Sequence, residues 1–284
     1  MRKTKCMRIP WKIKSWLFGV IDKLHASYIL HFLQKYVTRR SRGKSVAFNP
    51  DWDRHKRSLI KHKATGVVFE FGAGQSLAQN LYLSSVVNKQ IVVDLNPMLD
   101  FDLVQTSKDF LKRQNMLQLD SEVSNAKDLE RYGIFYKAPF DAKMTGLLDA
   151  SIDACVSTDT LEHIPKVEIL RILEELKRIL KPGGIITSKI DYSDHYSHTD
   201  DNIGPLNFLK FSDKEWKKYN HSNHYQSRLR HFEYKKLFED MGFEVTEELA
   251  VYSEEQIEDD LIIKFAACSP EWSATHGYFV VKKV

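Results

Sequence analysis

The sequence predicts an α/β fold with a mostly parallel sheet and helices on both of its faces. From residue 66 onward, short runs rich in β-branched and aromatic residues alternate with segments of helical periodicity. Such alternation is typical of βαβ units, whose strands are parallel. The length of 284 residues and the apolar content of 43% suit one large domain with a sizeable core.

The expected elements follow one another along the chain. Strands are expected at residues 67–71, 91–95, 135–138, 152–157, 185–190, 243–247 and 278–284, and helices at 78–87, 167–180 and 233–241. The second helix carries a leucine-rich face, and Pro182-Gly183-Gly184 is expected to end it. In such a sheet the ligand crevice lies beyond the carboxyl ends of the strands.

The N-terminal segment, residues 1–44, differs in charge from the rest of the chain. It has twelve Lys or Arg and one acid, whereas the remainder has 30 basic and 37 acidic residues. Its apolar residues include a helical series at Leu17, Ile21, Leu24, Tyr28, Phe32 and Tyr36. Two interpretations stay open: a helix lying on an anionic membrane surface, or a helix packed on its own domain. We therefore divide the chain into this basic amphipathic segment and a main domain, 45–284.

Few other features bear on location. No run of 18 apolar residues predicts a transmembrane helix, and no signal-peptide pattern is present. Cys6, Cys155 and Cys268 lie far apart, so neither a disulfide framework nor a structural zinc site is indicated. A cytoplasmic protein is expected, with peripheral membrane binding through residues 1–44 as an addition. This segment shows no RNA-binding signature, so no nucleic-acid partner is expected.

A glycine turn follows the first expected strand, in VVFEFGAGQSLAQN at residues 67–80. Gly72 and Gly74 let the backbone turn tightly and approach a ligand closely. Leu77 stands where the dinucleotide fingerprint wants a small residue, and no Gly-Lys-Ser/Thr follows, so nicotinamide and P-loop sites are disfavoured. Asp94 ends the next strand, 20 residues after Gly74, where a carboxylate can accept bonds from both ribose hydroxyls.

Further motifs complete a recognisable order: Asp141-Ala142, then Asp153-Ala154-Cys155-Val156-Ser157, then Leu161-Glu162-His163-Ile164, then Leu180-Lys181-Pro182-Gly183-Gly184. Together with Glu70-Phe71-Gly72-Ala73-Gly74 and Asp94, this series resembles class I S-adenosylmethionine-dependent methyltransferases, in the small-molecule, type 11-like branch. The resemblance covers roughly residues 60–192. It implies a Rossmann-like, mostly parallel seven-stranded sheet and S-adenosyl-L-methionine as cofactor.

The resemblance also implies a set of cofactor-binding residues: Glu70, Gly72, Gly74, Asp94, Leu95, Phe140, Asp141 and Thr158. Glu70 and the glycine turn would hold the methionine end, and Asp94 would take the ribose. Leu95 would pack on the adenine, Asp141 would bond its amino group with Phe140 beside it, and Thr158 would line the sulfonium side. Ser76 departs from the pattern, which often has Gly there, and its side chain would narrow the pocket.

Residues 189–202, KIDYSDHYSHTDDN, follow the fifth expected strand and so reach the ligand side of the sheet. We predict that His195 or His198 removes a proton from a hydroxyl acceptor, with Asp191 or Asp194 orienting the ring. Alternatives are Mg²⁺ held by several Asp oxygens and a solvated rim loop, and we name no metal ligand from the sequence. For His163, a chemical role and a loop-ordering role both stay open.

An insertion at about 192–232 follows, with candidate substrate-binding residues Tyr192, Trp216, His224, Arg228 and Arg230. Aromatic rings can stack on sugar faces, and Arg can clamp an anionic group. Some stretches here also resemble, more weakly, methyltransferases of polysaccharide biosynthesis. We therefore expect O-methylation of a glycan or glycolipid precursor.

Two rival functions stay open. The first is methylation of a quinone or other small aromatic acceptor, and the second is a non-catalytic cofactor-binding subunit. A polar pocket would favour the glycan, and an apolar pocket the quinone. Amino-group methylation is disfavoured, because Ser157-Thr158-Asp159-Thr160 stands where its Asn/Asp-Pro-Pro-Tyr/Phe motif would lie.

Overall fold

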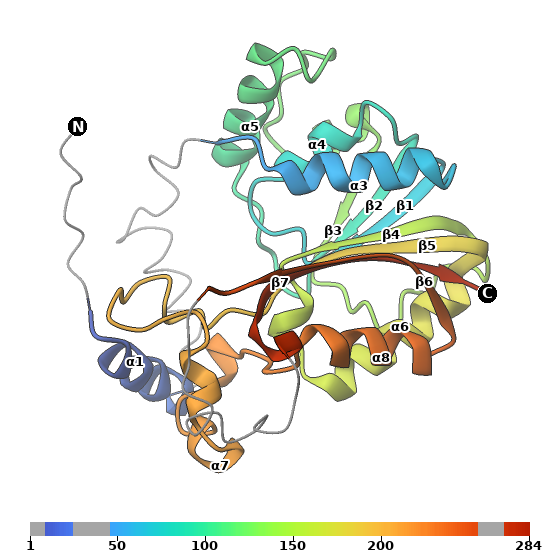
Figure 1. Ribbon diagram of the computed structural model, residues 1–284. Coiled ribbons are helices and arrows are strands. Elements are labelled where there is room, and N and C mark those ends of the chain that lie inside the picture. The colour runs from blue at the N-terminus through green and yellow to red at the C-terminus, as the bar shows by residue number, and fades with distance from the viewer. Residues whose placement is uncertain (1–8, 25–45, 255–269) are drawn as a thin grey trace.

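The computed structural model describes residues 9–24, 46–254 and 270–284 (Figure 1). Seven strands form one sheet in the order β3-β2-β1-β4-β5-β7-β6. Their bounds are β1 Val67–Phe71, β2 Lys89–Val93, β3 Ile134–Lys137, β4 Ile152–Thr158, β5 Leu180–Asp191, β6 Phe243–Tyr252 and β7 Ala274–Lys283. The first five pair in parallel, and β7 runs antiparallel to both β5 and β6. The predicted Rossmann-like seven-stranded sheet is confirmed, with an antiparallel edge.

Helices cover both faces of the sheet, as Figure 1 shows. On one face lie α3 Pro50–Lys61, α4 Ala78–Leu83 and α5 Phe101–Arg113, and on the other α6 Lys166–Ile179 and α8 His231–Asp240. Shorter helical turns are α7 Asp213–Trp216, η2 Ala126–Tyr132, η3 Leu161–His163, η4 Asn207–Lys210, η5 Ser222–His224 and η7 Pro270–Ser273. Among these residues no helix is both long and apolar enough to cross a membrane.

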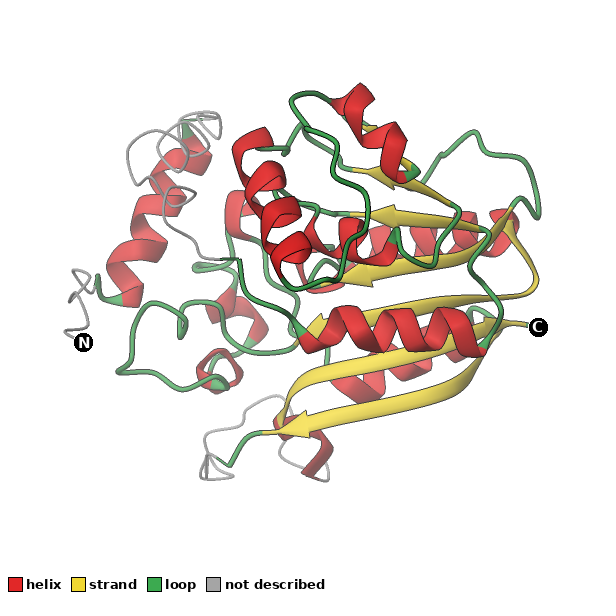
Figure 2. Cartoon of the chain, turned by 90° about the horizontal axis from the view of Figure 1, so that it is seen from above, coloured by secondary structure: helices red, strands yellow, loops and turns green. Residues whose placement is uncertain are grey.

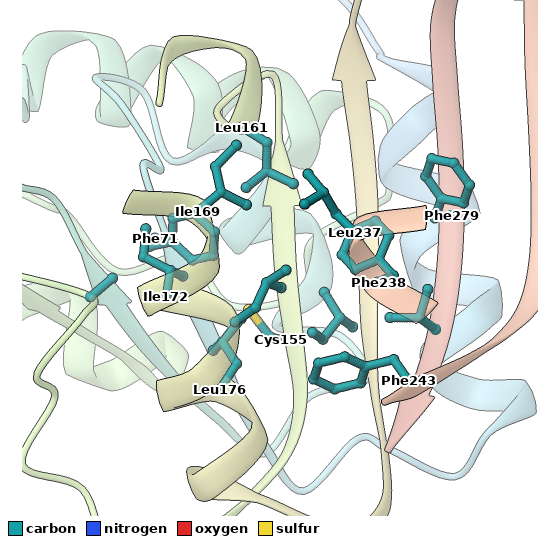
Figure 3. Close-up of a cluster of buried hydrophobic side chains, with 14 of the residues drawn as sticks. Phe71, Cys155, Leu161, Ile169, Ile172, Leu176, Leu237, Phe238, Phe243 and Phe279 are labelled. Atoms are coloured by element: carbon teal, nitrogen blue, oxygen red, sulfur yellow. The ribbon is translucent and has the colours of Figure 1, made fainter. Parts of the chain in front are cut away.

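Two apolar cores, one on each face, hold these layers together. Figure 3 shows one of them, where side chains of α6 and α8 meet over the strand that carries Cys155. Cys155 is fully buried there as a free thiol, and burial raises its pKa well above the usual value. Each fully buried Leu, Ile or Phe contributes roughly 1.5–3 kcal/mol through removal of apolar surface from water.

A third apolar cluster joins the N-terminal helix, α1 Trp11–Lys23, to the segment at 192–232. Trp11 and Phe18 of α1 pack with buried rings of that segment, including Tyr196, Phe208 and Trp216. Figure 2 shows most strand arrowheads pointing toward the side where α1 lies, so this cluster stands beyond the carboxyl ends of the parallel strands.

The first part of the predicted apolar series of the N-terminal segment is not the face that packs on the domain. Leu17 and Leu24 are exposed, whereas Trp11, Ser15 and Phe18 are buried. The later members of the series, from Tyr28 on, lie outside the described residues, and the division at residue 44 stays a prediction. Cys6 and Cys268 also lie outside them.

Candidate active site

The turn after β1 is held by two glycines in left-handed conformation, Gly72 at φ +75° and Gly74 at φ +74°. Gly72 N–H donates to the carbonyl of Val93 at 2.9 Å. A Cβ atom on Gly72 would stand 2.3 Å from Cγ2 of Thr160, but one on Gly74 would meet nothing within 4 Å. The first glycine therefore permits close packing, and the second leaves free space beside the backbone.

Asp94 stands directly beside this turn, after the last residue of β2. Its Oδ1 accepts from Gly74 N–H at 3.4 Å and its Oδ2 accepts from the Tyr136 hydroxyl at 3.0 Å. Burial raises the pKa of Asp94, and the bond from Tyr136 opposes that shift. Because each carboxylate oxygen has two lone pairs, Asp94 keeps capacity for a diol. The next residue, Leu95, is 67% exposed and offers an apolar surface there.

Glu70 lies behind the turn rather than in it. Its two carboxylate oxygens accept from Gln79 Nε2 at 3.1 Å and from Asn80 Nδ2 at 2.7 Å, both on α4. Burial raises the pKa of Glu70 to about 7, although these amide bonds oppose the shift. The expected direct contact with the methionine end is therefore replaced by a positioning role, in which Glu70 fixes α4 against the turn.

The remaining predicted cofactor residues lie near the same carboxyl ends of the strands as the glycine turn and Asp94. Phe140 is half-buried and donates its N–H to the Asp94 carbonyl at 2.9 Å, and the exposed Asp141 accepts from Lys143 N–H at 2.9 Å. The Thr158 hydroxyl donates inward to Gln79 Oε1 at 2.9 Å and lies 3.0 Å from Nε2 of His55. Thus Thr158 supports the sheet edge with its hydroxyl and does not present it outward.

Sequence reasoning missed His55 and Tyr136. His55 is fully buried on α3, and burial lowers its pKa to about 3, so it is neutral. No motif surrounds it, so no sequence signal identifies it. The Tyr136 side chain reaches Asp94 from β3, and its place near the end of a strand beside β2 was the available signal.

The predicted catalytic residues do converge. Nε2 of His195 and Nε2 of His198 lie 3.6 Å and 3.7 Å from Oδ2 of Asp191, and their two rings stack at 5.0 Å. Burial would raise the pKa of Asp191, but the His195 ring and the Ser193 hydroxyl outweigh it, so that pKa lies well below its usual range. Burial lowers the pKa of His198. The site thus combines an ionised carboxylate with imidazole rings.

His163 joins this group from the loop after β4, with its ring 4.8 Å from that of His195. We call His163, His195, His198 and His224 the histidine cluster. Burial lowers the pKa of His163, and it lowers that of His224 to about 3. A lowered pKa favours the neutral imidazole, the form that binds cations.

Contacts along one loop connect the glycine turn with the histidine cluster. The Thr160 hydroxyl donates to the Gly72 carbonyl at 3.3 Å. Two residues later, Oε1 of Glu162 accepts from Asp191 N–H at 3.3 Å. The loop from 159 to 163 therefore lies between the predicted cofactor side and the predicted acceptor side.

Four of the five predicted substrate residues lie in the interior, which corrects the expectation of free ligand-binding groups. Arg230 is fully buried and donates to the carbonyls of Trp272, Tyr192 and Ala274. Arg228 donates to two carbonyls and pairs with Asp213. Tyr192 and Trp216 are buried as well, at 1% and 3% exposure. Only His224, half-buried in the histidine cluster, stays available to a ligand.

The glycine turn, Asp94 and the neighbouring apolar side chain, at the carboxyl ends of a parallel sheet, define a protein that binds a ribose-containing cofactor. Residues 69–188 match the family model described as a methyltransferase domain. The chain is therefore an S-adenosylmethionine-dependent methyltransferase, and over these residues it is similar to class I enzymes of the type 11 branch.

Comparisons with individual proteins give weaker support than the domain match does. A search of curated proteins finds no match. A methyltransferase structure from Methanosarcina mazei is 15% identical, with 79% of this chain and 97% of that chain covered, at a TM-score of 0.43. The YcgJ protein from Bacillus subtilis is also 15% identical, with 81% and 98% covered and a TM-score of 0.43. At such TM-scores these likenesses carry no argument, and the assignment rests on the domain match.

Proposed function

We propose that the protein transfers a methyl group to a hydroxyl of a polar, polyhydroxylated acceptor, such as a glycan or glycolipid precursor. The observation that carries the proposal is the histidine cluster around Asp191, on the acceptor side of the cofactor turn. This rim is polar, with Lys189 and Asp159 paired beside it. A polar rim suits a hydroxylated acceptor better than a quinone, which would need an apolar pocket.

The residues present fit the cofactor. The open space at Gly74 would admit the part of the cofactor that lies against the backbone. The carboxylate of Asp94 would hold the ribose, and the exposed Leu95 would pack on the adenine. Bound there, S-adenosylmethionine would supply an electrophilic methyl group. The acceptor oxygen would bond to the methyl carbon as the carbon–sulfur bond breaks, and the electron pair of that bond would stay on sulfur.

The chain's own residues must activate the acceptor hydroxyl, because a neutral hydroxyl is a weak nucleophile. We assign the activation of the hydroxyl to His195, with Asp191 orienting its ring. His198 stands second, since its ring is also within 4 Å of Asp191 but its side chain is 51% exposed.

The test uses labelled cofactor with a panel of glycan and quinone acceptors. We expect His195→Ala to lose turnover while it binds S-adenosylhomocysteine as tightly as the wild type in calorimetry. Asp94→Ala is the opposite control and should lose binding. Turnover retained by His195→Ala would remove His195 from the mechanism, and turnover with quinones alone would replace the acceptor.

We also propose that helix α1 binds an anionic membrane surface. Its outward face carries the exposed side chains of Ile13, Trp16 and Leu17 at helical spacing, and the exposed Ile9 and Leu24 flank the helix. Lys12 and Lys23 lie on the same helix, and further basic residues precede and follow it in the sequence. Apolar side chains flanked by Lys are typical of helices that lie in the lipid headgroup region. A membrane-bound acceptor would then be presented near the histidine cluster.

A further inference from the structure

Three side chains of the candidate site converge on one point: Glu162, His163 and His195. One potential ligand atom from each lies within 4.8 Å of the others. Glu162 is only 1% exposed, and its Oε2 has no hydrogen-bond partner among the described residues. A buried carboxylate oxygen without a partner is costly, so its environment calls for a proton or a cation.

Hydrogen bonds join the segments that carry Glu162 and His195. The Glu162 carbonyl accepts from Ser227 N–H at 2.7 Å, while its Oε1 accepts from Asp191 N–H at 3.3 Å. Gln226 Oε1 accepts from His195 N–H at 3.1 Å. Three segments, after β4, after β5 and before α8, therefore share one rigid junction at this point.

One ring nitrogen of His163, Nδ1, is already engaged in a hydrogen bond. Its Nδ1 lies 3.1 Å from the carbonyl of Tyr225, which can only accept, so Nδ1 carries the proton. Nε2 then keeps a free lone pair. Metal-binding histidines commonly donate their other ring N–H to a carbonyl in this way, and they commonly have a carboxylate beside them, as His195 has Asp191.

The charges around the three residues are unbalanced without a cation. Three carboxylates lie near one another here, those of Asp159, Glu162 and Asp191. Lys189 forms an ion pair with Asp159, and its positive charge also acts on Glu162. One divalent ion would balance the two remaining negative charges.

We propose that Glu162, His163 and His195 hold a divalent metal ion that binds the acceptor hydroxyl. This inference rests on the proposed O-methylation and gives its activation step. Two imidazoles and one carboxylate favour Zn²⁺, Mn²⁺, Fe²⁺ or Co²⁺ over Mg²⁺, which prefers oxygen ligands. Three protein ligands leave a position open for the acceptor oxygen.

The bound ion lowers the pKa of the hydroxyl, whose proton leaves to solvent. The lone pair left on the oxygen forms the new bond to the methyl carbon, and the carbon–sulfur electron pair stays on sulfur. His195 then activates the hydroxyl as a metal ligand, and Asp191 orients its ring.

The test titrates chelator-treated, full-length protein with Co²⁺, followed by visible absorption and calorimetry. We expect one equivalent to bind. Loss of a residue that merely orients a ligand typically weakens metal affinity about 10–100-fold, so Glu162→Gln, His163→Ala and His195→Ala should each weaken it at least about 100-fold. His198→Ala is the matched control, since its ring stacks on His195 outside the trio, and it should bind Co²⁺ as the wild type does.

Binding of S-adenosylhomocysteine to each metal-free variant shows that it is folded and separates the two proposals. No Co²⁺ binding, or equal binding by wild type and the three variants, overturns the metal site. Full turnover by chelator-treated protein overturns it too, while the methyltransferase function stands. Failure of both metal-free and Co²⁺-loaded wild type to bind S-adenosylhomocysteine overturns the function itself.

Discussion

At the scale of single residues, the two turn glycines have different physical tasks. Gly72 must lack a side chain because Thr160 occupies the space where its Cβ would be, whereas Gly74 has open space there. Both have left-handed φ values, which cost an L-residue roughly 1–2 kcal/mol. The difference between the two substitutions therefore reports on packing alone.

We predict that Gly72→Ala destabilises the fold by about 2–4 kcal/mol, the sum of backbone strain and overpacking. Gly74→Ala should cost only about 1 kcal/mol, yet weaken S-adenosylhomocysteine binding at least tenfold because its methyl group enters the proposed cofactor space. Urea unfolding and calorimetry measure the two effects. Equal affinity of Gly74→Ala and wild type would place the cofactor elsewhere.

A second residue-scale prediction concerns Glu70, whose pKa rises from 4.5 to about 7 on burial. Between these values the folded protein holds a proton that the unfolded chain has lost, so stability falls as pH rises from about 4.5 to 7 and then levels off. Glu70→Gln removes this fall.

Unfolding free energies of wild type and Glu70→Gln are therefore expected to diverge with pH, by up to about 3 kcal/mol in favour of the variant at pH 8 relative to pH 4.5, at 1.36 kcal/mol for each pKa unit. Urea unfolding from pH 4.5 to 8 measures this. Glu130→Gln, at an exposed position, is the control and should show no divergence. A difference between Glu70→Gln and wild type that does not change with pH would contradict the argument.

Residue identity alone misled the sequence analysis at Arg228 and Arg230. A guanidinium has five donors, and these can serve a ligand or satisfy backbone carbonyls. Here they satisfy carbonyls of segments 192–211 and 272–274. Sequence shows the donors but not which acceptors the fold brings near them. By contrast, Asp191 ends β5 and His195 follows four residues later in the next loop, so their proximity was predictable.

At the scale of elements, strands were predictable where apolar runs end at turn residues, as for β1 and β4. The strand after α6 differs: β5 begins at Leu180 rather than at residue 185, because Leu180 pairs with Ile152 before an irregularity shifts the register. Helices α3 and α5 were missed. Both are polar on average along their length, and only three-dimensional packing shows which residues they bury.

Helix α1 offers a matched pair of tryptophans on opposite faces. Trp11 is 7% exposed and packs on Tyr196, Phe211 and Tyr219, whereas Trp16 is 65% exposed. We predict that Trp11→Ala releases α1, at a cost of about 3–5 kcal/mol to its docking, and Trp16→Ala changes stability by less than about 0.5 kcal/mol. Hydrogen exchange of the α1 amides measures the difference. Equal protection in both variants would refute this packing.

At the scale of the whole molecule, charge divides the chain unevenly. Residues 1–44 carry twelve cationic side chains and one acid, although the chain as a whole has a net charge of only +4. The remainder is thus net negative and would be repelled by an anionic surface. Among the described residues, helix α1 carries Lys12, Lys14 and Lys23 and packs on the insertion next to the histidine cluster, so we expect an anionic membrane to attract this side of the molecule.

We predict that neutralising Arg39, Arg40, Arg42 and Lys44 to Gln weakens binding to vesicles rich in phosphatidylserine at least tenfold, since each basic residue near such a surface contributes about 1 kcal/mol. The control neutralises Lys61, Lys127, Arg171 and Lys236, which are exposed on the main domain, and reaches the same net charge. Co-sedimentation at low and high salt measures both. Equal weakening in the two variants would mean that net charge, and not the basic segment, governs vesicle binding. That result would also contradict the proposed orientation.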